Sequence, residues 1–146
     1  MLLAYFDSSA IVPLLIDEPT TACCREILGK ADVSLSSSLS YVETSAGLVK
    51  AERMGRITPA ERKAAWQRFE GRWQYFLPIG TSDDIVSTAA SLAVAYALRG
   101  HDAVQCATAL ASVSEDFCAV SGDRRLLRAW AEEGIVTIDI NRGAGG

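Results

Sequence analysis

The fold of this chain is decided near its beginning, by the stretch LLAYFDSSAIVPLLI at positions 2–16. The first five residues, LLAYF, have the length and composition of a short buried strand. Asp7 follows this strand directly, and the apolar segment after it predicts a short helix with a kink at Pro13. The chain therefore begins as many α/β proteins begin, with a buried strand, a polar turn and a helix.

The same alternation continues to the end of the chain. Further strands are expected at 33–36, 76–79, 117–120 and 136–140, and helices at 20–28, 40–54, 58–73, 82–99, 102–111 and 123–133. Short apolar strands that alternate with helices predict a parallel sheet covered by helices on both faces. Right-handed crossovers place the carboxyl ends of all the strands at one edge of such a sheet.

Local signals set the expected helix boundaries. Ser40 with Glu43, and Thr58 with Glu61, have the spacing of a capping box. Ser82 is the expected cap of the next helix, and Gly100 its expected end. We expect a single domain over residues 1–141, followed by a flexible tail at 142–146.

Composition excludes some classes of protein. A net charge of −4 argues against a general nucleic-acid coat protein, although seven basic residues against three acids between Lys50 and Arg72 could form a local RNA-binding surface. No run approaches the roughly 20 apolar residues that a membrane span needs, and the apolar start lacks the basic residues of a signal peptide. The four cysteines have no zinc-site spacing, which predicts reduced thiols in a cytoplasmic protein.

Four acidic residues carry the functional prediction: Asp7, Glu43, Asp102 and Asp123. Each lies where a strand or short loop leads into a helix. In parallel sheets, ligand sites lie at the carboxyl edge of the strands. Gathered carboxylates repel one another unless a cation lies among them. Hard oxygen donors favour Mg²⁺ or Mn²⁺, so the pattern predicts metal-dependent phosphodiester chemistry.

Each acid also has an ordinary structural explanation. The three aspartates could cap the helices that follow them, and Glu43 could be the third residue of its capping box. Capping accounts for each position separately, but it does not explain why three aspartates converge on one edge, and one residue can both cap a helix and bind a metal. His101 is expected to be an exposed loop histidine, and Ser9 and Ser121 to donate hydrogen bonds to the carboxylates.

Five motifs in order connect the chain to a known family. They are YFDSSAIV at 5–12, DEP at 17–19, SYVET at 40–44, LRGHDAVQCATA at 98–109 and VSGDRRL at 120–126. With these motifs the chain resembles PIN-domain ribonucleases, in particular the VapC-type toxins of prokaryotic toxin–antitoxin pairs. The resemblance spans nearly the whole chain.

The resemblance implies a sheet in the order 3-2-1-4-5 and a catalytic quartet formed by the same four acids. Asp7, Asp102 and Asp123 would bind Mg²⁺ or Mn²⁺, with Ser9 and Ser121 in support; the separate roles of Glu43 and Asp123, and the number of ions, stay open. The implied partners are an RNA substrate, a VapB-type antitoxin and a second copy of the chain in a homodimer.

Lys50, Arg53 and Arg56 are candidate RNA contacts, because they lie on the second half of the helix that carries Glu43. The alternative is that they coat an ordinary solvated helix face.

Three other functions are the alternatives to metal-dependent RNA cleavage. A non-catalytic PIN-like binding module would share the fold without the chemistry. A receiver-type phosphoacceptor domain would need an acidic pair after the first strand and a lysine after the last, where this chain has Asn141 and Arg142. A haloacid-dehalogenase-type phosphatase would need an aspartate at Ser9. Metal-dependent RNA cleavage separates the proposed enzyme from these alternatives.

Overall fold

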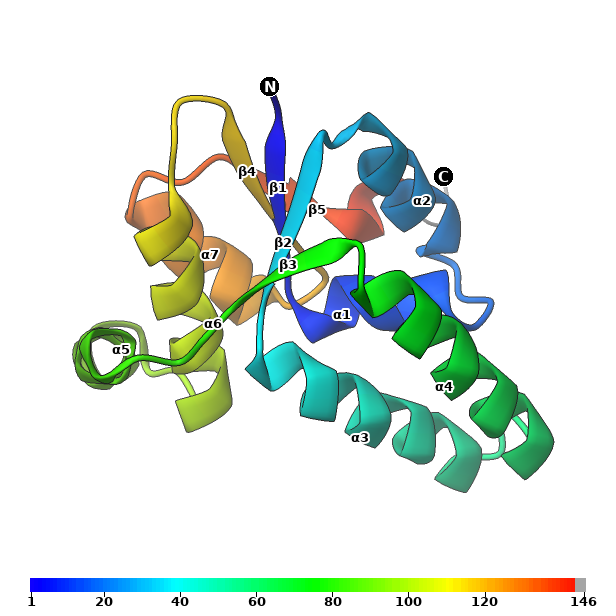
Figure 1. Cartoon of the computed structure of the whole chain (residues 1–146). Helices are drawn as coiled ribbons and strands as arrows, with labels where there is room; N and C mark the ends of the chain where they lie inside the picture. The colour runs from blue at the N-terminus through cyan, green and yellow to red at the C-terminus, as the bar shows by residue number, and fades with distance from the viewer. Residues whose placement is uncertain (144–146) are drawn as a thin grey trace.

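The central feature of the computed structural model, which describes residues 1–143, is a five-stranded parallel sheet. Its strands are β1 Leu3–Phe6, β2 Val33–Ser37, β3 Phe76–Ile79, β4 Phe117–Ser121 and β5 Thr137–Asp139. They lie in the order β3-β2-β1-β4-β5, which confirms the expected topology (Figure 1). In the centre, Tyr5 of β1 is paired with Leu35 of β2 and Ala119 of β4.

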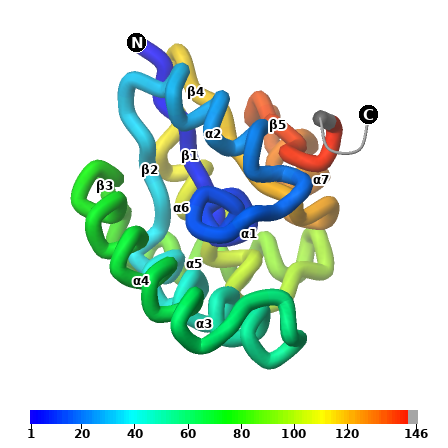
Figure 2. The backbone as a smooth tube through the Cα atoms, turned by 90° about the vertical axis from the view of Figure 1, so that its right-hand side faces the viewer, coloured from blue at the N-terminus to red at the C-terminus, as the bar shows by residue number. Residues whose placement is uncertain are grey.

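Helices connect the strands and cover the sheet. They are α1 Ser8–Ile11, the 3₁₀ turn η1 Val12–Leu14, α2 Thr21–Lys30, α3 Leu39–Arg53, α4 Pro59–Trp73, α5 Asp83–Tyr96, α6 Gly100–Ser112, α7 Arg124–Glu132 and the 3₁₀ turn η2 Ile140–Gly143. The long helices α3 and α4 lie side by side beyond the carboxyl ends of the strands (Figures 1 and 2). The change from α1 to η1 occurs next to Pro13, where a kink was predicted.

The alternation of side chains along β1 divides the core in two. Ala4 and Phe6 point to a cluster formed with α1, η1, α2, α3 and α4. Tyr5 points to the other face, into a cluster formed with α5, α6 and α7 that contains the buried Trp130. Both faces of the sheet are therefore covered, as the continuous apolar strands predicted.

Helix boundaries show where local signals were misleading. The Thr58 capping box is present, with reciprocal bonds between Thr58 and Glu61, and Ser82 caps α5. The predicted end of α5 at Gly100 is wrong: α5 ends at Tyr96, and Ala97 takes the left-handed conformation with φ of 53°. The backbone N–H of buried Leu98 donates to Ala93, which closes the helix without glycine.

Gly100 instead begins α6, so Asp102 lies in the first turn of this helix and does not cap it. The predicted box at Ser40 is also wrong, because α3 begins at Leu39 and the Ser40 hydroxyl bonds with Ser36 and Gln105.

The predicted tail begins inside η2, and residues 144–146 lie outside the described part of the chain. No helix within residues 1–143 is long and apolar enough to cross a membrane. All four cysteines are free thiols, and three of them are buried.

Candidate active site

The four predicted acids line one open pocket of about 550 Å³ at the carboxyl edge of the sheet, which we call the carboxylate pocket. Asp7 follows β1, Glu43 lies on α3, Asp102 on α6 and Asp123 at the start of α7. The remaining lining residues of the carboxylate pocket are Ser8, Ser9, Val12, Ala46, Gly47, Lys50, Arg99 and His101. Segments from both ends of the chain therefore meet at this pocket, as expected for the carboxyl edge of a parallel sheet.

Asp7 is the most buried of these acids, with 5% of its surface exposed. It occupies the cap position of α1 but makes no capping bond; its Oδ1 instead accepts a hydrogen bond of 2.7 Å from the Ser9 hydroxyl. Burial is the main reason why the pKa of Asp7 rises to about 7; the nearby charges of Glu43 and Asp123 add to this rise, and hydroxyl donors oppose it. The fold therefore buries a carboxyl group whose charge it does not compensate.

Ser9 of α1 and Ser121 at the end of β4 are in contact. Their hydroxyl oxygens lie 3.2 Å apart. The N–H of Gly122 donates to Ser9 at 2.8 Å, and the N–H of Asp123 donates to Ser121 at 2.9 Å. Ser9 thus donates to the Asp7 carboxylate as expected, and its contact with Ser121 links the segment after β1 to the end of β4 beside Asp123.

Asp123 combines two functions. Its Oδ1 accepts hydrogen bonds from the N–H groups of Arg125 at 2.9 Å and Leu126 at 3.1 Å, so the capping interpretation is correct for this residue. Its Oδ2 accepts no hydrogen bond from residues 1–143, while the side chain lines the pocket. One oxygen is structural, and the other remains available to a ligand.

Asp102 is buried in the first turn of α6 and faces two cationic or ionisable neighbours. Arg99 Nε lies 3.1 Å from Oδ2, and His101 Nε2 lies 3.4 Å from Oδ1. His101 was expected in a loop but lies on the helix, half-exposed at the pocket wall. A charged arginine at the carboxylate partly offsets the negative charge that Asp102 brings to the pocket.

Glu43 reaches the pocket because α3 packs closely against η1. A Cβ atom on Gly47, one turn after Glu43, would lie 3.0 Å from Val12 Cγ2, so a larger residue would force Val12 to shift and glycine allows the close approach. Burial raises the pKa of Glu43, and a hydrogen bond of 2.6 Å from Gln105 Nε2 opposes this effect. The site thus holds a second carboxylate that is partly withdrawn from water.

The chemistry of the donors fits a hard divalent cation. The pocket offers carboxylate oxygens and hydroxyls, and burial together with the neighbouring acids Glu43 and Asp123 raises the pKa of Asp7, so a bound cation would stabilise its charged form. Within residues 1–143 no three His, Cys, Asp or Glu side chains are grouped closely enough to form a finished metal site. Asp102 and Glu43 each have a hydrogen-bond partner in the protein, whereas Asp123 uses only Oδ1 in the described part of the chain, so a cation could bind Asp123 Oδ2 without breaking its capping bonds.

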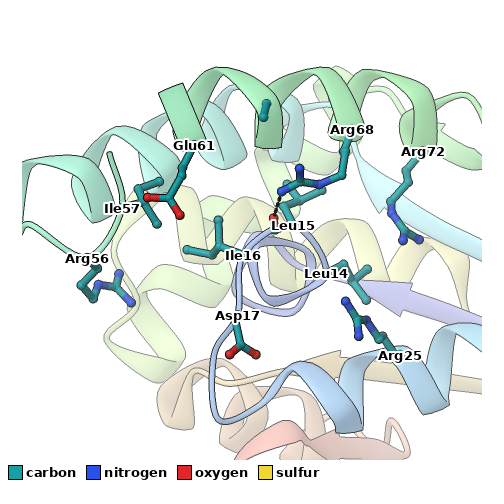
Figure 3. Close-up of a pocket in the computed structure, with 11 residues that line it drawn as sticks. Leu14, Leu15, Ile16, Asp17, Arg25, Arg56, Ile57, Glu61, Arg68 and Arg72 are labelled. Carbon is teal, nitrogen blue, oxygen red and sulfur yellow. Dashed lines mark hydrogen bonds between the residues drawn. The ribbon is translucent and has the colours of Figure 1, made fainter. Parts of the chain in front are cut away.

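The three predicted RNA contacts do not lie together. Lys50 lines the carboxylate pocket, whereas Arg53 is exposed in the last turn of α3. Arg56 lines a different cavity of about 540 Å³ and forms an ion pair of 2.5 Å with Glu18. This second cavity, the arginine pocket, is lined by Leu14, Leu15, Ile16, Asp17, Arg25, Arg56, Ile57, Glu61, Ala64, Arg68 and Arg72 (Figure 3).

Sequence reasoning missed three residues of the carboxylate pocket and its wall. Gly47 gave no local signal, because its function depends on Val12 far away in the chain. Arg99 and Gln105 each lie three positions from Asp102, a spacing that places side chains on one helix face and could have identified them.

Comparison with known proteins agrees with this geometry. Residues 4–131 match the family model of the PIN domain. Ribonuclease VapC45 from Mycobacterium tuberculosis (strain CDC 1551 / Oshkosh) is 37% identical over 126 residues, which cover 86% of this chain and 88% of that protein.

Two solved structures show the same fold at low identity. A toxin–antitoxin complex from Klebsiella pneumoniae has a chain with a TM-score of 0.64 and 19% identity, covering 94% of this chain and 97% of that one. FitAcB from Neisseria gonorrhoeae has a TM-score of 0.67 and 13% identity, with coverages of 95% and 99%. The motifs, the sheet order, the carboxylate pocket and the family match agree: this chain belongs to the PIN-domain family.

Proposed function

We propose that this chain is a divalent-metal-dependent endoribonuclease and the toxin of a toxin–antitoxin pair. The observation that carries the proposal is the gathering of Asp7, Glu43, Asp102 and Asp123 around one pocket at the sheet edge. A relative that is 37% identical is named a ribonuclease, which supports the same activity. A structural role alone would not explain why the fold buries Asp7 beside other acids.

Asp7, Asp102 and Asp123 would hold Mg²⁺ or Mn²⁺, which supplies an activated water nucleophile and stabilises charge on the scissile phosphate. The contact of Ser9 with Ser121 links the segment after β1 to the end of β4 beside Asp123. Glu43, the fourth acid of the pocket, would contribute to cation binding and orient the attacking water. The Lys50 ammonium, at the same pocket, would attract a phosphate oxygen of the RNA strand.

The activity is tested with the purified protein and a mixed RNA substrate in the presence of Mg²⁺, Mn²⁺ or EDTA. The proposal expects internal cleavage that requires the metal. RNA binding without cleavage at any metal concentration would favour the non-catalytic binding module.

The toxin role is tested in cells. Expression of the chain alone should slow the growth of a bacterial host, and Asp7→Ala should remove this effect. Co-expression of a VapB-type antitoxin encoded beside the gene should restore growth and yield a stable complex with the chain. Growth that is equally slow with Asp7→Ala would contradict toxicity through this site.

We further propose that residues 1–141 function as one cytoplasmic PIN domain that forms a homodimer through the pair α3 and α4. Tyr41 on α3 packs against Trp66 and Trp73 of α4, yet it keeps 37% of its surface exposed, and the neighbouring Val42 is 58% exposed. Association would cover these side chains. Light scattering at micromolar concentration should give the mass of a dimer, and Val42→Asp should shift it to a monomer.

A further inference from the structure

A buried glutamine connects the helix of Asp102 with the helix of Glu43. Gln105 lies one turn after Asp102 on α6 and is 1% exposed. Its Nε2 lies 2.6 Å from Glu43 Oε1 and 2.9 Å from Ser40 Oγ. Its Oε1 accepts a hydrogen bond of 2.5 Å from the Tyr5 hydroxyl. Both ends of this buried amide therefore have partners from other elements of the fold.

The chemistry of the partners fixes the orientation of the amide. A charged carboxylate only accepts hydrogen bonds, so the nitrogen of Gln105 must face Glu43. Tyr5 is fully buried, and burial together with the charge of Asp7 raises its pKa well above the ordinary value. Its hydroxyl therefore stays protonated and donates to the oxygen of Gln105. A flipped amide would lose the bond to Glu43 and place two oxygens against each other.

The network continues to the strand that precedes Asp7. Ser40 lies 2.7 Å from the Ser36 hydroxyl, and Ser36 donates to the Phe6 carbonyl at 2.6 Å. Because a carbonyl only accepts, the single hydroxyl proton of Ser36 goes to Phe6, and Ser40 supplies the proton between the two serines. A continuous series of buried hydrogen bonds thus joins the end of β1 to Glu43.

We propose that Gln105 is a positioning residue, whose amide holds the Glu43 carboxylate in one orientation at the wall of the carboxylate pocket. Glu43 has three rotatable side-chain bonds and other acids nearby, so without this donor it would turn away from them. A neutral amide supplies the donor without adding positive charge, whereas an arginine or lysine at this position would compete with a cation. The effect on catalysis rests on the proposed function, but the hydrogen bond itself does not.

The first test removes the donor and keeps the volume. Gln105→Met should lower kcat for RNA cleavage by about 10- to 100-fold, the range for groups that orient metal ligands, and leave KM within about twofold. The affinity for Mn²⁺, measured by its paramagnetic signal without RNA, should also fall. Cys106→Ala, at a buried position of the same helix, should change thermal stability without changing kcat or Mn²⁺ affinity. Wild-type kcat and Mn²⁺ affinity in Gln105→Met would overturn the proposal.

The second test exchanges donor and acceptor. Gln105→Glu places two carboxylates at the position of the 2.6 Å contact and should lower the Tm. Combining it with Glu43→Gln restores an amide–carboxylate pair, although the bond to Ser40 stays lost. The Tm of the double variant should therefore lie above that of Gln105→Glu, while cleavage stays low because the carboxylate has moved away from the pocket. Recovery of cleavage would overturn the proposal, and so would a Tm no higher than that of Gln105→Glu.

A third measurement separates this inference from the proposed function. The side-chain amide of Gln105 should give a downfield, slowly exchanging pair of NMR signals, and Glu43→Ala should move the pair toward ordinary positions. If the wild type fails to cleave RNA but the signals behave in this way, the proposed function is wrong and the positioning contact stands. Signals that do not respond to Glu43→Ala would overturn the contact, whatever the activity.

Discussion

The carboxylate pocket and the arginine pocket are nearly equal in size, about 550 and 540 Å³, but they treat charge in opposite ways. In the arginine pocket the fold stabilises charge: the capping bonds at Thr58 lower the pKa of Glu61, and Arg56 pairs with Glu18. In the carboxylate pocket burial raises the pKa of Asp7 to about 7. A fold that makes the charged form of its own carboxyl group unfavourable indicates a ligand site. The number of charged residues in a pocket does not by itself indicate one.

The largest difference between the two pockets should appear in cleavage. Asp7→Asn and Asp102→Asn should each lower the rate of RNA cleavage on the order of 10³-fold or more, as removal of other catalytic side chains does. Asp17→Asn, the matched change in the arginine pocket, should leave the rate unchanged. The measurement is single-turnover cleavage at saturating Mn²⁺. Normal cleavage by both Asp7→Asn and Asp102→Asn would show that the proposed site is wrong.

The second difference concerns stability and pH. The carboxyl of Asp7 has a folded pKa of about 7 against an ordinary value of 3.8, so it is protonated in both states at low pH. As the pH rises through this window, the unfolded chain releases a proton that the folded chain retains, and the metal-free protein loses stability. Asp7→Asn should therefore raise the free energy of unfolding at pH 8, on the order of 2 to 4 kcal/mol, with the gain fading toward pH 4.

Glu61 provides the control of opposite sign. Its pKa is lowered, so its charge stabilises the fold above the ordinary pKa, and this contribution is lost as the pH falls through the folded value. Glu61→Gln should lower the Tm at neutral pH and have little effect in acid. Thermal unfolding of both variants at several pH values measures the contrast. A gain from Asp7→Asn that does not depend on pH would contradict the cause given for its raised pKa.

A smaller effect is expected for the basic residues. Lys50→Ala should weaken RNA binding several-fold and reduce the salt slope by about one, because one phosphate contact is lost at the pocket. Charge reversal at Arg53 should do less, and reversal at Arg56 least of the three, since Arg56 lines the other pocket. Arg128→Glu on α7 is the distant control. Equal effects at Lys50 and Arg128 would show that RNA responds only to the overall field.

The smallest effect should come from the exposed ion pair of the arginine pocket. Arg56→Ala removes the contact with Glu18 and should change the free energy of unfolding by less than about 1 kcal/mol. Denaturant titration in low and high salt measures this change. A larger loss would mean that the two pockets differ less than their geometry indicates.

The sequence predicted the features that depend on local pattern. Buried strands, their parallel direction and the location of Asp7 and Asp123 at one sheet edge follow from apolar runs and from the geometry of crossovers, whereas the order of the strands was implied by the family resemblance. The capping box at Thr58 is also a local signal, with proline and glutamate in their preferred positions. The strands and the capping box could be predicted because each is signalled by residues that are neighbours in the chain, and the common edge follows from the general geometry of parallel sheets.

The features that were missed depend on distant partners. Ser40 has the spacing of a cap, but its hydroxyl is used by Gln105, 65 residues away. Gly100 was expected to end α5, but the helix ends earlier, at Tyr96. Leu98 is buried in the core, and Ala97 before it adopts the left-handed conformation. Arg56 was placed with Lys50 by helix spacing alone, while its ion pair with Glu18 lies in another pocket. Tertiary contacts decided each case.

The most direct test of metal-dependent cleavage at the carboxylate pocket is the rate of RNA cleavage as a function of Mn²⁺ concentration, for the wild type, Asp7→Asn and Asp17→Asn. If the pocket binds the cation with which the chain cleaves RNA, the wild type and Asp17→Asn should show the same saturating dependence and no cleavage in EDTA. The rate for Asp7→Asn should stay near background at every concentration. Cleavage by the wild type in EDTA, or a normal Mn²⁺ dependence for Asp7→Asn, would contradict this assignment.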